Sequence, residues 1–405
     1  MATILQNKLV LFGAGKIGRS FIGQLFSVGG YEVVFIDINK SVIDELNHHR
    51  HYKLILKSDK VEVVNIYNVR GVYAGDSQKV INEVATAGIV AVSVGKEGLK
   101  HLFSQLSKGL LERYKIDKNY PLDIIIAENM RNADDIFHQQ LKKLLPCEYP
   151  MDKLVGLIET SIGKMVPLMQ RKDVLEDKLQ VFSEPYNTLI LNKKGFKNPI
   201  PDIEGLAPKE NMKAWVDRKL FIHNLGHSAA AYVGYIHHPE FVYLYEELAI
   251  PEVNRLVRET MLQAANILMK KYPNEFTLHD LTEHVDDLIT RFQNKALEDT
   301  IFRVGCDLSR KLGPQDRLAG AIEAALELNL PYDKILYALV CGCHFRAKDE
   351  DGNRYKGDIE FDELFKKGIR SVLTVLSGFD ETRNGKLIAE AETIDKQLRN
   401  LKSGG

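Results

Sequence analysis

Short apolar runs alternate with longer amphipathic stretches over the first half of the chain. Runs of four to eight residues rich in Val and Ile are typical of strands buried on both faces, whereas apolar residues at every third or fourth position predict helices. The predicted strands are 8–12, 31–36, 88–94, 122–127 and 154–159, and the helices between them include 99–114 and 133–145. This alternation predicts βαβ units on a mainly parallel sheet.

Further β-rich segments and a linker complete the first half. Residues 52–56 and 61–66 predict a hairpin, and 179–193 predicts a late addition to the sheet. Residues 197–209 hold three prolines and a glycine, which is typical of a linker. Beyond it the pattern predicts only helices, at 211–235, 242–271, 279–292, 315–328, 333–346, 360–376 and 383–402.

The predicted architecture therefore has two domains. Residues 1–196 form an α/β Rossmann-type domain with a mainly parallel sheet, and residues 197–405 form an all-α domain that carries the substrate and the catalytic groups. A length of 405 residues agrees with two domains.

Composition and charge exclude several classes of protein. Lysine and arginine number 54 against 55 aspartates and glutamates, so the basic excess typical of nucleic-acid binding is absent. The sequence has no apolar stretch long enough to cross a membrane. Its four scattered cysteines do not resemble a disulfide framework. We expect a soluble, cytoplasmic protein with a small-molecule partner and, because no coiled coil is predicted, a monomer or a small homo-oligomer.

A glycine-rich turn follows the first predicted strand. Gly13-Ala14-Gly15-Lys16-Ile17-Gly18 lies between that strand and a helix that reaches about Val28. In this context Gly13 allows the tight turn, Gly15 lets the backbone approach a pyrophosphate, and Gly18 allows close packing. The helix N-terminus adds unpaired N–H groups and a positive dipole end. The turn predicts a dinucleotide site.

An acidic residue ends the second predicted strand. Asp37 lies 19 residues after Gly18, where a carboxylate accepts both hydroxyls of an adenosine ribose and repels a 2′-phosphate. The cofactor is therefore predicted to be NAD in preference to NADP. The alternative is a glycine-rich turn with an ordinary surface aspartate.

The next strands end in polar and small residues. Ser93 and Gly95 follow the strand at 88–94, and Asn129 follows the strand at 122–127. Carboxyl ends of parallel strands face the ligand crevice, so Ser93 and Gly95 are candidates for the nicotinamide half of the cofactor. The alternative is a loop without ligand contact.

Two cysteine and histidine clusters were considered as metal sites. Cys341-Gly342-Cys343-His344 lies in a predicted helix and has no second cysteine pair at zinc-site spacing. Buried apolar cysteines are the preferred interpretation. His48, His49 and His51 lack a carboxylate partner in the sequence pattern and are interpreted as solvated surface. We therefore expect no catalytic metal.

A polar face in the second half can carry the chemistry. On an α-helix His227 lies about 80° from Lys219, and Asn224 about 140°, so the three share one broad face. Oxidation of an alcohol needs a base for the proton and donors for the developing oxyanion. A lysine whose pKa is lowered by burial can be that base. The alternative is a lysine at a domain edge with its ammonium group in water.

This pattern resembles a known family. Lys219-x4-Asn224-x2-His227 is similar to the signature of the polyol-specific long-chain dehydrogenases and reductases. Supporting stretches are FGAGKIGRSFIG at 12–23, AENM at 127–130, FSE at 182–184, RKLFIHNLGH at 218–227 and HFR at 344–346. The resemblance covers nearly the whole chain, including the change from Rossmann to helical domain.

The resemblance implies roles for individual residues. Lys219 is implied as general base, Asn224 and Asn129 as oxyanion donors, and His227 as the residue that orients substrate and lysine. Family members use no catalytic metal. The cations implied or expected to contact a phosphorylated substrate are Arg303, Lys311, His344 and Arg346. On a continuous helix the side chains of Arg303 and Lys311 would differ in direction by about 80°, so both could reach one cleft. About half of the neighbouring cations are expected to pair instead with Asp307, Asp316 or Glu323.

One position departs from the family pattern. Relatives carry an Asp-Arg pair before Ile-Val-Pro, whereas this chain has Gly163-Lys164 before Met165-Val166-Pro167. The exchange of arginine for lysine is not neutral at a bidentate site, and it leaves the identity of the substrate open.

The leading hypothesis is NAD-dependent, metal-independent oxidation of a hexitol phosphate, with D-mannitol 1-phosphate and fructose 6-phosphate as the implied pair. A second hypothesis keeps the chemistry but uses a free hexitol or a sugar acid such as tagaturonate. A third is a non-catalytic NAD-binding protein, against which the presence of Lys219, Asn224, His227 and Asn129 argues.

Overall fold

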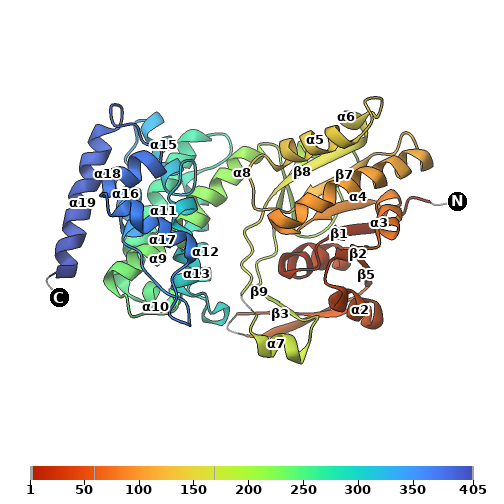
Figure 1. The fold of residues 1–405 in the computed structure, drawn as a ribbon, viewed down its shortest axis with the longest axis horizontal. Helices are drawn as coiled ribbons and strands as arrows, with labels where there is room; N and C mark the ends of the chain where they lie inside the picture. The colour runs from red at the N-terminus through yellow and green to blue at the C-terminus, as the bar shows by residue number, and fades with distance from the viewer. Residues whose placement is uncertain (1–2, 59, 168, 404–405) are drawn as a thin grey trace. The chain divides into compact units, whose positions relative to one another are not determined.

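The computed structural model describes residues 3–58, 60–167 and 169–403. The chain divides into two compact units, Met1–Val216 and Asp217–Gly405. The first unit combines strands and helices, and the second is helical (Figure 1). The predicted fold class, a Rossmann-type domain followed by an all-α domain, is confirmed.

The main sheet of the first unit has the order β11-β10-β8-β7-β6-β1-β2-β5 among the described residues. Its strands are β1 (Lys8–Phe12), β2 (Glu32–Asp37), β5 (Val69–Tyr73), β6 (Ile89–Val92), β7 (Leu122–Ile126), β8 (Val155–Ser161), β10 (Leu189–Asn192) and β11 (Leu206–Lys209). Neighbouring strands in the part of the sheet with the order β8-β7-β6-β1-β2-β5 pair in parallel. Strand β10 pairs with β8 in antiparallel orientation. The strand order reverses between β1 and β6, which is where open α/β sheets bind their ligands.

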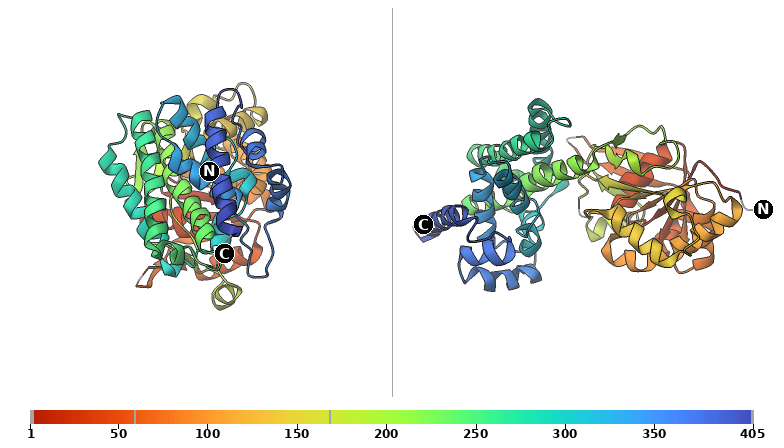
Figure 2. Two further views of the ribbon diagram at one scale, coloured as in Figure 1. Left: turned by 90° about the vertical axis from the view of Figure 1, so that its left-hand side faces the viewer. Right: turned by 90° about the horizontal axis from the view of Figure 1, so that it is seen from above.

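Both faces of this sheet are buried, which explains why its strands are rich in apolar residues. Leu9 and Leu11 of β1 face one core, with residues of η1 (Gly18–Gly23), α1 (Gln24–Val28) and α2 (Lys40–His49). Val10 and Phe12 face the other core, with residues of α3 (Ser77–Ala85), α4 (Gly95–Ile116) and α5 (Ala133–Leu144). The helical layers beside the strands are visible in Figure 2.

A small sheet accounts for the other β-rich segments. The predicted hairpin is confirmed as β3 (Tyr52–Leu56) and β4 (Glu62–Ile66), and β9 (Val181–Ser183) pairs in parallel with β3. The segment predicted as one late addition thus divides, since β9 joins the small sheet and β10 the main sheet.

The predicted linker is wrong in its last part. Residues 206–209 form β11, which pairs in parallel with β10 and places Pro208 opposite Leu191. A proline is tolerated there because β11 is the last strand in the sheet order and needs ladder hydrogen bonds on one side alone. The compact units divide after Val216, twenty residues beyond the predicted boundary.

The second unit is built around a helix that is buried over most of its length. Helix α9 (Leu225–His237) packs against α10 (Leu244–Ala249), α11 (Pro251–Lys271), α13 (Ile301–Gly305) and α16 (Asp333–Cys343). Small residues allow this close approach: a Cβ on Gly226 would come within 2.5 Å of the Met261 sulfur. The remaining larger helices are α12 (Leu278–Phe292), α15 (Ala319–Glu327), α17 (Lys356–Phe365) and α19 (Gly385–Ser403).

The predicted helices of this half are present, but several are interrupted. The stretch predicted at 211–235 comprises α8 (Met212–Arg218), the π-helix η3 (Lys219–Asn224) and α9. None of the helices in the described part of the chain combines the length and the apolar character that a membrane span requires.

Candidate active site

The glycine-rich turn has the backbone geometry that close packing imposes on it. Gly13 has a φ of +100°, and a Cβ there would lie 2.1 Å from the Ser93 carbonyl oxygen. A Cβ on Gly18 would lie 2.1 Å from the Gly13 carbonyl oxygen, whereas a Cβ on Gly15 would meet no atom within 4 Å. Two glycines are therefore required by the protein itself, and the third leaves open space beside Lys16 and Ile17 at the start of the helix.

Asp37 is joined to this turn. Its Oδ2 accepts a hydrogen bond of 2.7 Å from the Ala14 N–H, and its Oδ1 accepts one of 2.8 Å from the Asn39 N–H. The carboxylate at the end of β2 thus lies at the rim of the glycine-rich turn. Open space at Gly15 and an acidic rim at Asp37 fit the pyrophosphate and the ribose of a dinucleotide.

Arg19 holds the glycine-rich turn through hydrogen bonds to backbone carbonyl oxygens, and it was not among the residues predicted from the sequence. Arg19 is buried, and its Nε donates a 2.7 Å hydrogen bond to the Ala14 carbonyl oxygen. Its Nη1 donates to the Leu179 carbonyl oxygen. A GxGxxG pattern does not specify what lies beneath the turn, so only the fold reveals this contact.

Lys219 and Asn224 are the first and last residues of a π-helix. On an α-helix, the geometry expected for this segment, Asn224 would lie about 140° from Lys219. In η3 the hydrogen bonds run between residues five apart, so positions 219 and 224 lie one above the other along the helix. The assumed α-helical wheel is therefore wrong for this segment, and the two side chains leave the helix closer in direction than predicted. Single π-turns occur frequently at functional sites.

The surroundings of Lys219 lower the pKa of its ammonium group. Burial, and to a smaller extent the positive charge of Arg317, lower the pKa of Lys219 to about 8, while Asp316 opposes the shift. Arg317 is itself buried; its Nη1 donates to the Asn224 carbonyl oxygen at 3.3 Å and to Ser228 Oγ at 3.2 Å. One arginine thus holds the end of the π-helix and disfavours a proton on the lysine.

His227 is held by a buried carboxylate. Its Nε2 lies 2.9 Å from Asp299 Oδ2, and its ring stacks on Phe292 with a centroid distance of 4.6 Å. Asp299 also accepts a 2.7 Å hydrogen bond from Arg303 Nε. Burial lowers the pKa of His227 even though Asp299 opposes the shift. A neutral imidazole fixed in this way leaves Nδ1 for a ligand. The sequence pattern gave no signal for Asp299.

The cations expected to contact substrate lie in different surroundings. Arg303 and Lys311 are not on one continuous helix, because α13 ends at Gly305 and Asp307 has a φ of +71° before α14 (Leu308–Lys311). Lys311 is buried, donates a 2.6 Å hydrogen bond to the Val304 carbonyl oxygen, and has its pKa lowered to about 8 by burial. The expected 80° divergence is therefore wrong, and Lys311 folds back on α13.

Most of the other cations in this group are paired with acids. His344 Nε2 lies 2.7 Å from Asp395, and Arg346 Nε lies 3.1 Å from Asp362. Arg310 pairs with Asp307, and Arg317 pairs with Asp316 at 2.9 Å. Pairing with Asp307 and Asp316 was expected for part of the group. Lys311 differs because its contact in the described structure is a carbonyl group and not a carboxylate.

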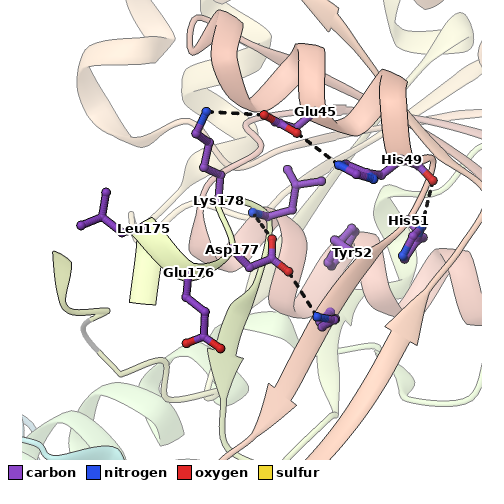
Figure 3. A pocket seen from close by; sticks show the side chains of 10 residues that line it. Glu45, His49, His51, Tyr52, Leu175, Glu176, Asp177 and Lys178 are labelled. Atoms are coloured by element: carbon purple, nitrogen blue, oxygen red, sulfur yellow. Dashed lines mark hydrogen bonds and ion pairs between the residues drawn. The ribbon is translucent and has the colours of Figure 1, made fainter. Parts of the chain in front are cut away.

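The two candidate metal segments are residues 341–344 and the histidines at 48, 49 and 51. Cys341 and Cys343 are buried, as predicted. In the described ranges no group of three or more His, Cys, Asp or Glu side chains could hold a metal ion. The expectation that the exposed histidines lack a carboxylate is wrong for His49, whose Nε2 lies 3.3 Å from Glu45. Both residues line a pocket of about 400 Å³ in which Asp177 and Lys178 also form ion pairs (Figure 3).

Lys164 is the residue that departs from the expected Asp-Arg pattern. Its side chain is buried, and Nζ donates a 3.0 Å hydrogen bond to Asn187 Oδ1 and lies 5.2 Å from the centre of the Phe21 ring. Lys164 therefore packs against η1, the helix that follows the glycine-rich turn.

Comparison with known proteins identifies the family. Residues 7–205 match the mannitol dehydrogenase Rossmann domain, and residues 211–398 match the mannitol dehydrogenase C-terminal domain. The chain belongs to the mannitol dehydrogenase family. Two similar relatives are the mannitol-1-phosphate 5-dehydrogenases of Buchnera aphidicola subsp. Acyrthosiphon pisum strains APS and Tuc7; each is 30% identical over 97% of this chain and 100% of its own length.

Solved structures agree with the mannitol dehydrogenase fold. A substrate-free D-sorbitol dehydrogenase has a TM-score of 0.80 and 18% identity, covering 98% of this chain and 94% of its own. The Pseudomonas fluorescens mannitol 2-dehydrogenase, in a ternary complex with NAD and D-mannitol, has a TM-score of 0.73 and 16% identity, covering 99% and 93%. Membership of the family confirms the predicted enzyme class, an NAD-dependent polyol dehydrogenase with a small-molecule substrate.

We expect the wild-type enzyme to prefer NAD over NADP by a factor of about a hundred, because Asp37 repels a 2′-phosphate. Asp37→Asn removes the charge but keeps one oxygen that can accept a backbone hydrogen bond. Combined with Ile38→Arg at an 82% exposed neighbour, it should relax the preference to within about tenfold. The measurement is kcat/KM for each cofactor, with Ile38→Ala as the control. A wild-type enzyme that favours NADP would contradict this role of Asp37.

Proposed function

We propose that this mannitol dehydrogenase family member oxidises D-mannitol 1-phosphate to fructose 6-phosphate with NAD, using Lys219 as general base and no catalytic metal. The observation that carries this proposal is Lys219 itself. It begins a π-helix that ends at Asn224, and its surroundings lower its pKa to about 8. The substrate is suggested by the two relatives named as mannitol-1-phosphate 5-dehydrogenases.

The proposed chemistry assigns one task to each group. Neutral Lys219 takes the proton from the reacting hydroxyl group, and bound NAD supplies the acceptor for the hydride that leaves the same carbon. The Asn224 side chain donates to the oxygen as negative charge develops on it, and the family resemblance gives Asn129 as a second donor. His227 orients the substrate hydroxyl, because Asp299 and the Phe292 ring fix its imidazole.

The state of Lys219 supports this assignment. A base must be unprotonated before it can act, and a pKa near 8 leaves a useful neutral fraction at physiological pH. An exposed lysine would be neutral to less than about 0.1% at pH 7. Arg317 supplies part of the difference through its positive charge, and its own hydrogen bonds go to Ser228 of α9, Asn224 of η3 and Asp316.

The substrate is tested with a panel of sugar alcohols and their phosphates. NADH formation should have its highest kcat/KM with mannitol 1-phosphate, and NADH consumption its highest with fructose 6-phosphate. Faster turnover of mannitol or of tagaturonate at equal concentration would exclude the phosphate but leave the dehydrogenase chemistry in place.

Lys311 is the cation best suited to bind the phosphate, because it is buried and its described contact is not a carboxylate. Lys311→Met should raise KM for mannitol 1-phosphate by roughly tenfold to a hundredfold, the cost of one charged hydrogen bond. KM for mannitol should change less than threefold. Lys348→Met, at an exposed lysine, is the control. Equal effects on both substrates would remove Lys311 from phosphate binding.

A second candidate substrate is a free hexitol or a sugar acid. Two observations favour it. Arg303, His344 and Arg346 already pair with carboxylates, and Lys164 is buried against Phe21, at the position where the family resemblance implies an arginine. The substrate panel separates the two candidates directly.

A further inference from the structure

A carboxylate holds the turn at the carboxyl end of β6. Glu128 follows β7, and its Oε1 accepts hydrogen bonds from two successive backbone groups, the Val94 N–H at 2.6 Å and the Gly95 N–H at 2.9 Å. Gly95 has a φ of +72° and is the first residue of the 22-residue helix α4. Glu128 therefore binds the N-terminus of α4 from the neighbouring strand.

This turn is continuous with the dinucleotide turn. The Ser93 carbonyl oxygen is the atom that a Cβ on Gly13 would strike, and the Ser93 N–H donates a 2.8 Å hydrogen bond to the Phe12 carbonyl oxygen. The switch point of the sheet lies between β1 and β6. Since Asp37 marks the adenosine side at β2, the nicotinamide half of a dinucleotide belongs on the β6 and β7 side, where Ser93, Gly95 and Glu128 lie.

Charge at this position acts differently on the two states of the cofactor. The N-terminus of a helix carries a partial positive charge, which disfavours a neighbouring cation. The oxidised nicotinamide ring carries one positive charge, and the reduced ring is neutral. A carboxylate bound at the N-terminus of α4 makes the net local charge negative instead of positive. Because burial raises the pKa of Glu128, with its two backbone hydrogen bonds opposing, this carboxylate is poorly solvated and gains from a nearby cation.

We propose that Glu128 is a positioning residue that sets the cofactor preference: it holds the Ser93–Gly95 turn with a charged acceptor and thereby favours NAD over NADH. The proposal rests on NAD as the cofactor. It does not depend on Lys219 or on the identity of the substrate.

The chain contains a matched control. Glu159 of β8 occupies the same kind of position one helix further from the switch point, where its Oε1 accepts a 3.4 Å hydrogen bond from the Ala133 N–H at the start of α5. Burial raises its pKa too, and Asp134 adds to the shift. If a carboxylate on a helix N-terminus mattered only for stability, replacement of either glutamate would have similar consequences.

The test measures dissociation constants of NAD and NADH for the full-length protein by calorimetry and by NADH fluorescence. Glu128→Gln keeps an oxygen that accepts both hydrogen bonds but removes the charge. It should raise the dissociation constant of NAD on the order of tenfold and leave that of NADH within twofold of wild type. This is the effect expected for one unit charge at short range in a partly buried site. Glu128→Ala should weaken both, because the turn loses its acceptor. Glu159→Gln should leave the ratio of the two constants at the wild-type value.

The outcomes distinguish an effect of the Glu128 charge from an effect of its hydrogen bonds to the turn. An unchanged ratio in Glu128→Gln overturns the proposal, as does an equal shift of the ratio in Glu159→Gln. Thermal unfolding of each variant shows whether the fold is intact, and if Glu128→Ala fails to fold, Glu128→Gln still decides. Because no substrate is present, the result is independent of the proposed reaction.

Discussion

We expect the replacement of Lys219 with alanine to lower kcat for polyol oxidation by on the order of 10²–10⁴, the usual contribution of a general base. NADH binding stays close to wild type, because the predicted cofactor residues lie in the first unit. Added primary amines such as methylamine should restore part of the activity in proportion to their free-base concentration. Lys213→Ala, at an exposed lysine in α8, should retain wild-type turnover. A Lys219→Ala enzyme with near-normal kcat would exclude the lysine as base.

The pH profile provides a second measurement of the same role. A base acts when unprotonated, so kcat/KM for oxidation should rise with pH and level off above a midpoint at about 8, the lowered pKa of Lys219. Reduction needs the protonated lysine, so its rate should fall through the same midpoint. Arg317→Met removes a neighbouring positive charge and should move the midpoint upward. A midpoint that does not respond to Arg317→Met would assign the profile to another group.

The parallel sheet was predictable because its strands are buried on both faces. That burial makes β1, β2, β6, β7 and β8 rich in apolar residues, and all five were expected within two residues of their observed bounds. Strand β5 was missed because Arg70 and Gly71 interrupt its apolar pattern. Strand β11 was missed because Pro208 and its neighbours have the composition of a linker, and its edge position became evident from the fold alone.

The candidate site was predictable where local sequence fixes the backbone. The glycine-rich turn belongs to this class, since Gly13 and Gly18 leave no room for a Cβ. The π-helix at 219–224 does not, because nothing in the sequence separates hydrogen bonds to the fifth residue from those to the fourth.

Residues that act through tertiary contacts were also missed. Asp299 reaches His227 across 72 positions and is part of no local pattern. Glu128 lies in the AENM stretch, but that stretch gives no indication of its contact with Val94, 34 positions away. Arg19 similarly contacts Leu179, which lies in a distant segment of the first unit. Such partners emerge only when the strands and helices that carry them are placed side by side.

Stability should depend on pH through Glu247, a group with no assigned role in catalysis. Glu247 of α10 is fully buried against Gly234 of α9, and among the described residues neither of its carboxyl oxygens has a hydrogen-bond partner. Burial raises its pKa from 4.5 to about 8, and the charges of Glu240 and Glu246 add to the shift. The folded protein therefore holds this carboxyl group in its neutral form at pH 7, whereas the unfolded chain ionises it.

The sign of the effect follows from these two pKa values. Below about pH 4.5 the group is neutral in both states, so its ionisation adds no pH dependence to the free energy of unfolding. As pH rises toward 8 the unfolded state alone loses the proton, so the free energy of unfolding falls, by up to about 5 kcal/mol in total for a shift of this size. Above pH 8 both states are ionised and the decline ends.

Glu247→Gln should remove most of this decline, because a glutamine of nearly the same shape stays neutral at every pH. Urea unfolding of the helical unit at pH 5 and pH 9 measures it: the variant should match wild type within about 1 kcal/mol at pH 5 and exceed it by about 3–5 kcal/mol at pH 9. Glu327→Gln, at an exposed glutamate of α15 that does not contribute to the Glu247 pKa shift, is the control and should leave the pH dependence nearly unchanged. An equal pH dependence in wild type and Glu247→Gln would mean that the buried carboxyl group is solvated or paired in solution, and its raised pKa would then be wrong.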